Sequence, residues 1–366
     1  MHQEPTLPLS PDPPSYRSLP ILLTYLSICG TLAAQKCIAI YHGYRHQQQQ
    51  QQQQQRGNSQ RQWPSRKRKF AVFCLLALLS LGTTWYHMFC FFGHSYRSWA
   101  GGDDAAAAAL TRGYYSLPRR WELWLRDRKL FREAWESVSE SPERVWWSGQ
   151  IFLFTVGWSL VLGVVGRKYR IPHVWSFMLI GQIVAISFAQ NLFTLTVLVS
   201  ESSGKRDSSR NAGNSDSDSD KDEHEEETIW TPPGLLELTP IVLSLASAAV
   251  VPSVAHTPLF MPVLLVPHFL LFVPTLLSRS GLAGLGSYRG VGRYRRLFWW
   301  IGAAAVGIQA RSTFLLLSEE QRGVVPVVKR LLATMGEHPA VSSVGWDVVF
   351  CSVGLVVSIL LGPYDL

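Results

Sequence analysis

Long apolar stretches separated by strongly polar ones dominate the pattern along this chain. The clearest case is residues 146–199, where two apolar runs flank the short basic connection RKYRIP at 167–172. His173 is the one ionisable side chain in either run. Each run is long enough to cross a bilayer core, which takes about 20 residues at 1.5 Å per residue. The pattern predicts a transmembrane helical hairpin.

Further apolar runs predict six more spans. They cover residues 21–41, 70–92, 235–251, 258–277, 297–317 and 342–361. The region 232–277 is rich in proline, which removes an amide donor and kinks a helix, so we expect a pair of kinked spans there. The fold class predicted from this pattern is an all-α polytopic transmembrane helix bundle of about eight spans with disordered polar loops.

The polar stretches predict the loops of this bundle. Residues 1–20 are rich in proline and residues 200–231 are strongly acidic, so both are expected to be disordered. Residues 93–144 predict a polar loop that contains an amphipathic helix, either lying on the bilayer or capping the bundle in solution. The remaining loops are a poly-glutamine and basic loop at 42–69, a basic glycine-rich loop at 278–296 and a loop at 318–341.

The charges of the loops conflict with a strictly alternating topology. The chain is 47% hydrophobic and only 16% charged, and its net charge of +8 is carried by the loops. Basic loops favour the cytosolic side, which suits 42–69 and 167–172, but strict alternation then places 278–296 on the opposite side. Either the proline-rich pair includes a re-entrant segment or the first run does not span the membrane. The endoplasmic reticulum and the plasma membrane are not distinguished.

The basic cluster before the second span suggests a lipid partner. Arg66, Lys67, Arg68 and Lys69 directly precede an apolar run, where a cluster of this kind favours anionic lipid headgroups. We expect no nucleic acid as a partner. The five cysteines show no spacing typical of a zinc site or a disulfide framework, and no cofactor is predicted.

Two charges in neighbouring spans form the sharpest polar pattern. Arg311 lies about 9 Å before the end of its span and Asp347 about 8 Å into the next one, at 1.5 Å per residue. Consecutive spans run antiparallel, and an unpaired charge at that depth costs several kcal/mol. We therefore predict that Arg311 pairs with Asp347, with a structural contact favoured and a proton or ion pathway as the alternative.

Other residues within the spans are weaker candidates. Further intramembrane polar candidates are His268, His87, Gln182 and Asn191, which bond to neighbouring helices or line a polar path. Small residues at helical spacing predict close helix packing in two places, at Gly181, Ala185 and Ala189 and at Ala303 and Gly307. No catalytic residue or metal ligand is assigned.

Two phrases resemble a group of known sequences. The segments IPHVWSFMLIGQIVAISFAQNLF and HPAVSSVGWDVVFC, together with the proline-rich start and the glutamine tract, are similar to uncharacterised multi-pass membrane proteins of filamentous fungi. The resemblance covers mainly residues 146–199 and 338–357. It implies a membrane protein and brings no known activity.

Three functions are compatible with these patterns. Kinked, proline-rich spans and polar residues within them favour transport or lipid handling. A membrane-embedded lipid-modifying enzyme would have to use His87, His268 or Asp347, although no metal cluster or acid–base pair at helical spacing supports it. A non-catalytic membrane scaffold would use the polar loops to recruit partners.

Overall fold

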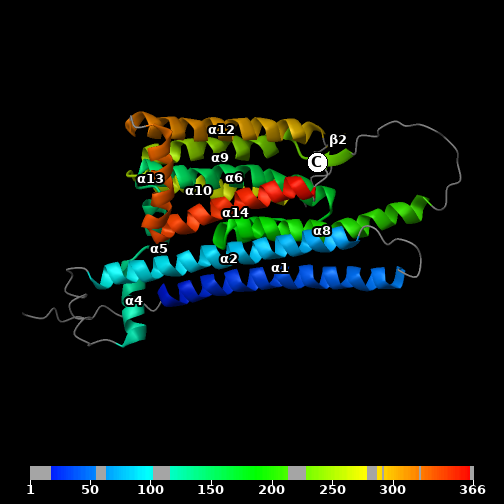
Figure 1. The fold of residues 1–366 in the computed structure, drawn as a ribbon, viewed down its shortest axis with the longest axis horizontal. Coiled ribbons are helices and arrows are strands. Elements are labelled where there is room, and N and C mark those ends of the chain that lie inside the picture. The colour runs from blue at the N-terminus through cyan, green and yellow to red at the C-terminus, as the bar shows by residue number, and fades with distance from the viewer. Residues whose placement is uncertain are drawn as a thin grey trace, which may run out of the picture.

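The structure is a computed structural model that describes residues 18–54, 63–101, 116–212, 228–277, 287–290, 292–320 and 323–362. Helices make up almost all of this part of the chain, which confirms the predicted helical class in outline (Figure 1). The exception is the antiparallel pair of β1 (Thr228–Thr231) and β2 (Ser287–Gly290). The helices are α1 (Ser18–Gln54), α2 (Trp63–Ala100), α4 (Leu117–Asp127), α5 (Leu130–Ser137), α6 (Pro142–Lys168), α7 (Trp175–Ile183), α8 (Ile186–Ala212), α9 (Gly234–Val254), α10 (Phe260–Leu270), α11 (Val273–Leu276), α12 (Gly292–Glu320), α13 (Val324–Glu337) and α14 (Pro339–Leu361).

Six of these helices are long and apolar enough to cross a bilayer. They are found at Leu19–Gln49, Arg66–Ala100, Pro142–Lys168, Gly234–Val254, Gly292–Ser318 and Pro339–Leu361. Each contains or overlaps one of the predicted spans. The other two predicted spans correspond to the shorter apolar helices Ile186–Ser200 and Phe260–Leu276, so the count of eight is not confirmed.

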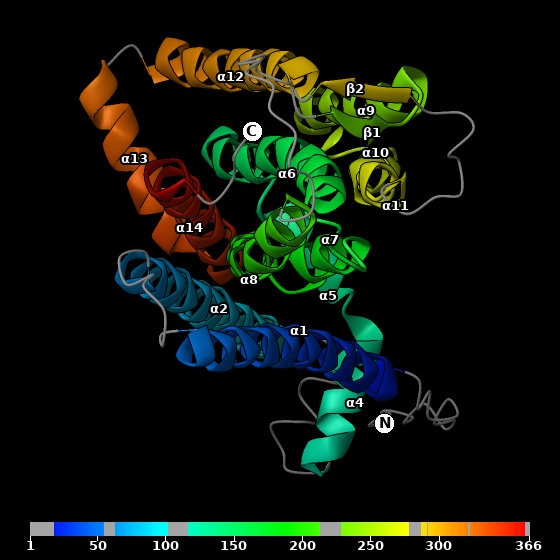
Figure 2. The same ribbon diagram turned by 90° about the vertical axis from the view of Figure 1, so that its right-hand side faces the viewer.

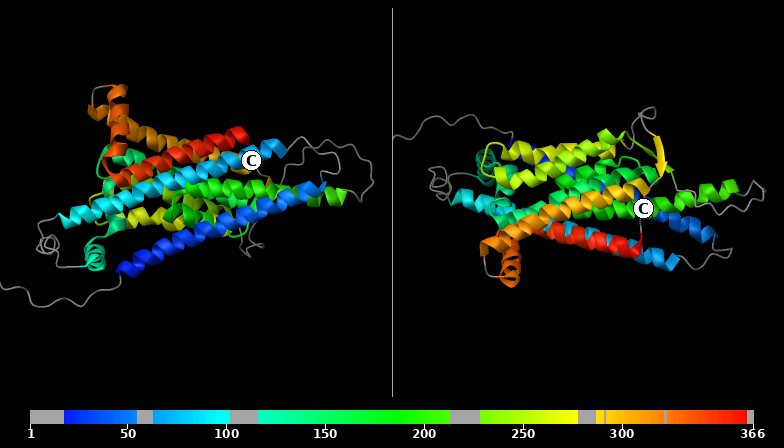
Figure 3. Two further views of the ribbon diagram at one scale, coloured as in Figure 1. Left: turned by 60° about the horizontal axis from the view of Figure 1, so that its bottom comes forward. Right: turned by 90° about the horizontal axis from the view of Figure 1, so that it is seen from above.

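The long helices lie side by side, and short helices cross one end of the bundle (Figure 1). We call this the α13 end, because α4, α5 and α13 lie there. The opposite end, where β1 pairs with β2, is the β end. Viewed from the β end, α6, α7 and α8 occupy the centre, with α9, α10 and α12 on one side and α1 and α2 on the other (Figure 2). Two further views show the same order (Figure 3).

Local sequence signals set the ends of the central helices. Ser141 caps α6 by accepting a hydrogen bond from the amide of Arg144 at 3.4 Å, and Pro142 occupies the first turn, where no amide donor is needed. The basic pair Arg167 and Lys168 ends α6, which suits the negative end of its dipole. The short basic segment 167–172 is therefore the connection that the sequence predicted between α6 and the next helix.

Helices also extend into segments predicted as loops. α1 continues through most of the glutamine tract to Gln54, and α2 begins at Trp63, ahead of the basic cluster. α8 continues to Ala212, inside the predicted acidic loop. The predicted amphipathic helix of residues 93–144 is present as two helices, α4 and α5. The predictions for residues 1–17 and for most of the acidic tract lie outside the described residues.

Residues 173–199 do not form the single crossing helix that the sequence predicted. α7 runs back along α6: a Cβ on Gly166 would meet Val174, and one on Gly181 would meet the indole of Trp158 at 2.9 Å. Its nine residues rise about 13 Å, roughly half of a bilayer core. The chain then reverses at Val184 and Ala185.

α8 returns to the β end, from which α7 came. It runs parallel to α1, because Tyr25 of α1 contacts Ile183 at the reversal while Gln47, further along α1, donates a hydrogen bond to Val199. We call α7 and α8 the re-entrant hairpin. This course places the ends of α1, α6 and α8 together at the β end (Figure 1). α11 lies there too, because a Cβ on Gly163, near the end of α6, would meet Pro274 of α11. The topological conflict therefore does not require a re-entrant segment at 232–277.

Asp347 of α14 holds the reversal. Its carboxyl group accepts hydrogen bonds from the amides of Ile186 and Ser187, at 3.1 and 2.9 Å, and from the Ser187 hydroxyl at 2.5 Å. The first amides of a helix have no partner within it, and the partial positive charge there favours a carboxylate. Asp347 therefore supplies the N-terminal cap that α8 lacks in its own sequence.

The predicted pair of Arg311 with Asp347 is wrong. Arg311 is exposed on α12, which packs on α6, α9 and α13, whereas α14 packs on α2, α6, α8 and α13. α13 lies across the α13 end and separates the two helices (Figure 2). The prediction assumed that helices joined by a loop are adjacent, but here the connection is itself a helix. Asp347 thus faces the re-entrant hairpin.

Substitution of Asp347 should destabilise the protein, whereas substitution of Arg311 should not. Asp347→Ala leaves two amides and a hydroxyl buried without an acceptor, which should lower the free energy of unfolding by about 2 kcal/mol or more. Arg311→Gln serves as the matched control. Thermal unfolding in detergent measures both. Equal losses in the two variants would support the Arg311–Asp347 pair and contradict the cap.

Candidate functional site

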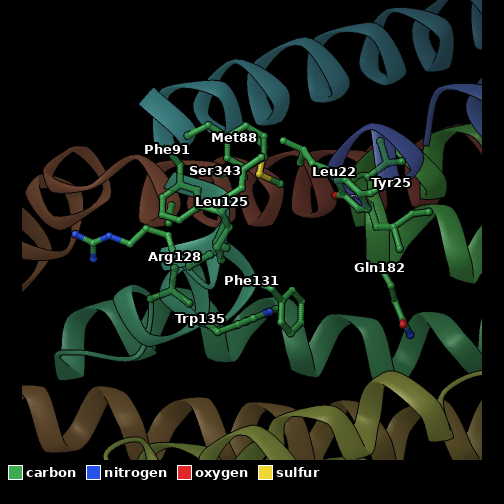
Figure 4. A pocket seen from close by; sticks show the side chains of 18 of the residues that line it. Leu22, Tyr25, Met88, Phe91, Leu125, Arg128, Phe131, Trp135, Gln182 and Ser343 are labelled. Atoms are coloured by element: carbon green, nitrogen blue, oxygen red, sulfur yellow. Dashed lines mark hydrogen bonds between the residues drawn. The ribbon is translucent and has the colours of Figure 1, made fainter. Parts of the chain in front are cut away.

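The main candidate site is an apolar cavity of about 530 Å³ between the reversal of the re-entrant hairpin and the α13 end. Its walls come from α1, α2, α14, the hairpin tip and the segment of α4 and α5. Its lining residues include Tyr25, Met88, Phe91, Leu125, Phe131 and Ser343 (Figure 4). A cavity of this volume with mostly apolar walls is typical of a ligand site.

A few polar groups border the apolar cavity. The Tyr25 hydroxyl lies at the hairpin tip, where it donates a hydrogen bond of 2.6 Å to the carbonyl of Ile183. Gln182 lines the cavity, and its buried Nε2 has no hydrogen-bond partner within the described part of the chain. Arg128 stands at the opposite wall, with its guanidinium extending away from the apolar side chains (Figure 4). The cavity therefore has polar groups at both ends and an apolar middle.

A second, polar cavity of about 880 Å³ adjoins the first at the α13 end. Phe91 and Arg128 line both cavities. The polar cavity is also lined by charged and histidine side chains, namely Arg132, Glu133, Glu136, Glu140, His94, His256 and His338. The two cavities together form an amphipathic space, apolar towards the bundle centre and polar towards its end.

The helices α4 and α5 hold the boundary between the two cavities. The indole of Trp124 donates to the Ser95 hydroxyl at 3.2 Å, and Ser95 in turn donates to Glu133 at 3.0 Å. The indole of Trp99 donates to Asp127 at 3.1 Å. These bonds fix α4 and α5 to the end of α2. The two helices thereby form a wall between the cavities. The amphipathic pattern predicted a helical segment here, but not its position at the cavities.

His338 in the polar cavity also begins α14. Its Nδ1 accepts a hydrogen bond of 3.2 Å from the amide of Ala340, so this nitrogen must be unprotonated. Burial, with the neighbouring His94 and Arg144, lowers the pKa of His338 to about 4, and Glu140 opposes the shift. The ring of His94 lies 4.8 Å from that of His338. His338 is thus a neutral cap over most of the pH range.

A buried ion pair joins three helices at the β end. Arg167 contacts Glu237 at 2.9 Å, and Tyr294 donates to both oxygens of the same carboxylate at 3.1 Å. Glu237 and Tyr294 are completely buried. We interpret this cluster as a structural link between α6, α9 and α12. The sequence analysis did not identify this cluster, because Glu237 stands alone among apolar neighbours and forms no spacing pattern with Arg167 or Tyr294.

The other predicted polar residues are dispersed. His268 lies against Trp135 and Phe152, with Nδ1 2.8 Å from the carbonyl of Leu264, and His87 packs beside Tyr86. Asn191 is fully buried and donates to the carbonyl of Ser187 at 2.8 Å. Of the predicted candidates, the structure therefore brings only Gln182 to the apolar cavity.

The two groups of small residues that predicted close helix packing differ in their surroundings. Gly181 meets Trp158 closely, and Ala185 and Ala189 are buried around the reversal. Ala303 and Gly307 are exposed, and nothing lies within 4 Å of a Cβ on Gly307, so the prediction that they pack against a helix of this chain is wrong. α12 turns this face away from α6 and α9.

The basic cluster lies at the β end, at the start of α2. Arg66 donates to the carbonyl of Leu198 in α8, so it also joins α2 to the re-entrant hairpin. Lys67 and Arg68 are exposed. Contact of the cluster with anionic lipids stays a prediction.

The groups around the two cavities can bind a ligand through apolar contacts, hydrogen bonds and charges. Ser95, the hydroxyl beside His94, is bonded to Glu133 and Trp124, not to a histidine. In the described ranges, no group of three or more His, Cys, Asp or Glu residues is arranged to hold a metal ion. The arrangement offers an amphipathic cavity, hydrogen-bond donors and charges of both signs.

Comparison with protein-family models, curated proteins and solved structures finds no match to this chain. The resemblance to fungal membrane proteins therefore stays a prediction, and the function has to be argued from the cavities themselves.

The stability of the protein should fall in acid because of His338. An unfolded histidine binds a proton below about pH 6.5, but folded His338 does so only near pH 4, so this part of the stability is lost as the pH falls between these values. We expect a loss of about 1 kcal/mol, since His338 is partly exposed and its charge is screened by solvent. Thermal unfolding across this pH range measures it. His338→Asn, which caps a helix without titrating, should show a smaller loss, and an unchanged pH dependence would contradict the assignment.

Proposed function

We propose that this chain is an integral membrane protein that handles lipids, taking an acyl chain into the apolar cavity. The observation that carries the proposal is the amphipathic pair of cavities, which share Phe91 and Arg128. An acyl chain needs an apolar volume, and its polar end needs a hydrated or charged neighbour. The two cavities supply these in the right order.

The outer surface of the bundle supports a bilayer environment. Large apolar side chains are exposed on several of the long helices, including Leu78 of α2, Trp299 of α12 and Ile359 of α14, each with more than two thirds of its surface accessible. Soluble proteins rarely expose so much apolar surface in contiguous patches. Bilayer hydrocarbon would cover these faces.

The position of the cavity suggests entry from within the membrane. Its wall at α1 and α2 is built from the two helices at the edge of the bundle (Figure 2). Among the cavity residues on α1, Ile21 is exposed and Leu22 is partly exposed. A lipid tail could therefore pass between these helices without crossing the packed centre around α6 and α7.

The re-entrant hairpin favours a lipid-handling protein with a movable segment, rather than a rigid non-catalytic scaffold. Broken helices are tolerated at membrane depth where protein satisfies their free backbone groups, as Asp347 and Tyr25 do here. Transporters use such discontinuous helices at their binding sites. The hairpin tip forms the inner end of the apolar cavity, so movement of the tip would change the space available to a tail.

Filling the apolar cavity should abolish lipid retention. Ala134 of α5 lines the cavity, and Ala134→Trp would occupy much of its volume. We expect purified wild-type protein to retain a lipid in mild detergent and the variant to lose it, measured by mass spectrometry of the extracted lipids. Ala304→Trp, on the exposed face of α12, is the matched control. Retention of the same lipid by both variants would overturn the proposed function.

A further inference from the structure

The polar cavity contains charges of both signs. Arg128 and Arg132 line it together with Glu133, Glu136 and Glu140. Arg132 pairs with Glu136 at 2.7 Å, and Arg144, from the start of α6, pairs with Glu140. The formal charges of these six side chains cancel. A ligand with a large net charge of either sign would therefore meet groups that repel it, whereas a ligand with separated opposite charges would not.

Arg128 is the least engaged of these arginines. Its ion pair with Glu133 has an N–O distance of 3.7 Å, which is too long for a hydrogen bond, and the other oxygen of Glu133 already accepts from Ser95. The guanidinium carries five donors in a planar fork that fits phosphate or carboxylate oxygens. Among the described residues, no closer partner of Arg128 is found, so these donors are available to a ligand.

Arg128 also has the right position for one particular group of a lipid. It stands where the two cavities meet, so a ligand group bound to it would have an apolar volume on one side and a polar volume on the other. In a glycerophospholipid, the phosphate lies between the acyl chains and the terminal headgroup. The geometry of the two cavities matches this order.

We propose that the polar cavity binds the zwitterionic headgroup of a glycerophospholipid, with its phosphate on Arg128 and its cationic group towards Glu136 and Glu140. This inference rests on the proposed function, since it requires the acyl chain to occupy the apolar cavity. Because Arg132 and Arg144 are already paired with Glu136 and Glu140, a lipid that carries additional negative charge finds no unpaired arginine beyond Arg128 among the described residues around the polar cavity. Phosphatidylcholine and phosphatidylethanolamine belong to the predicted class, and phosphatidic acid does not.

Competition between lipids with the same acyl chains tests the headgroup. The full-length protein in detergent is loaded with a fluorescent fatty acid, which is displaced by phosphatidylcholine, phosphatidic acid or diacylglycerol. We expect phosphatidylcholine to displace the probe about tenfold better than diacylglycerol, the gain typical of a charge-assisted hydrogen bond. Phosphatidic acid should be weaker than phosphatidylcholine, because it lacks a cationic group and its additional negative charge has no unpaired arginine in the polar cavity.

Variants at Arg128 and Glu136 assign the headgroup preference to these residues. Arg128→Gln should lower the affinity for phosphatidylcholine about tenfold relative to that for diacylglycerol and so remove the preference, whereas Arg128→Lys should retain part of it. Glu136→Gln should raise the affinity for phosphatidic acid relative to that for phosphatidylcholine. Arg126→Gln, whose arginine pairs with Asp127 and lines neither cavity, is the matched control. Diacylglycerol binding shows that each variant is folded.

The outcomes separate the inference from the proposed function. Equal displacement by phosphatidylcholine and diacylglycerol in the wild type would overturn the headgroup site but leave the acyl site standing. Stronger displacement by phosphatidic acid would overturn the zwitterionic assignment. An unchanged preference in Arg128→Gln would overturn the role of Arg128. If the fluorescent fatty acid does not bind at all, the proposed function fails.

Discussion

The cap that Asp347 places on α8 is the interaction on which the rest of the architecture depends. Without an acceptor for the amides of Ile186 and Ser187, a helix could not begin in the middle of an apolar bundle, because each unpaired amide would cost about 1–3 kcal/mol. With the cap, the chain reverses after α7 and α8 returns to the β end. The reversal leaves the region between the hairpin tip and the α13 end free for the apolar cavity.

The same constraint links the fold to the proposed lipid site. The hairpin tip closes the inner end of the cavity, held by Tyr25 of α1 on one side and Asp347 on the other. The outer end is closed by α4 and α5, which the hydrogen bonds of Trp99 and Trp124 fix to α2. The cavity is therefore a consequence of two local features. α7 ends partway along the bundle, and α4 and α5 lie across the opening of the cavity.

Periodicity and length predicted the elements that depend on local composition. The six long apolar helices and an amphipathic segment before α6 can be read from the chain. The reversal could not, because Val184 and Ala185 carry neither proline nor glycine and the residue that stabilises it lies about 160 positions further on. A usable signal was present: Asp347 needed a partner, and a helix N-terminus serves as well as an arginine. The cavity itself arises from non-local packing and has no sequence pattern.

A topology map tests the central claim, the re-entrant hairpin, most directly. Single cysteines at Ser59, between α1 and α2, and at Ser215, between α8 and β1, would be labelled with a membrane-impermeant reagent in a variant without the five native cysteines. If α7 and α8 enter and leave from the β end, both positions are labelled from the same side of the membrane. Labelling from opposite sides would mean that residues 173–199 cross the bilayer, and it would contradict the hairpin together with the cap and the cavity that depend on it.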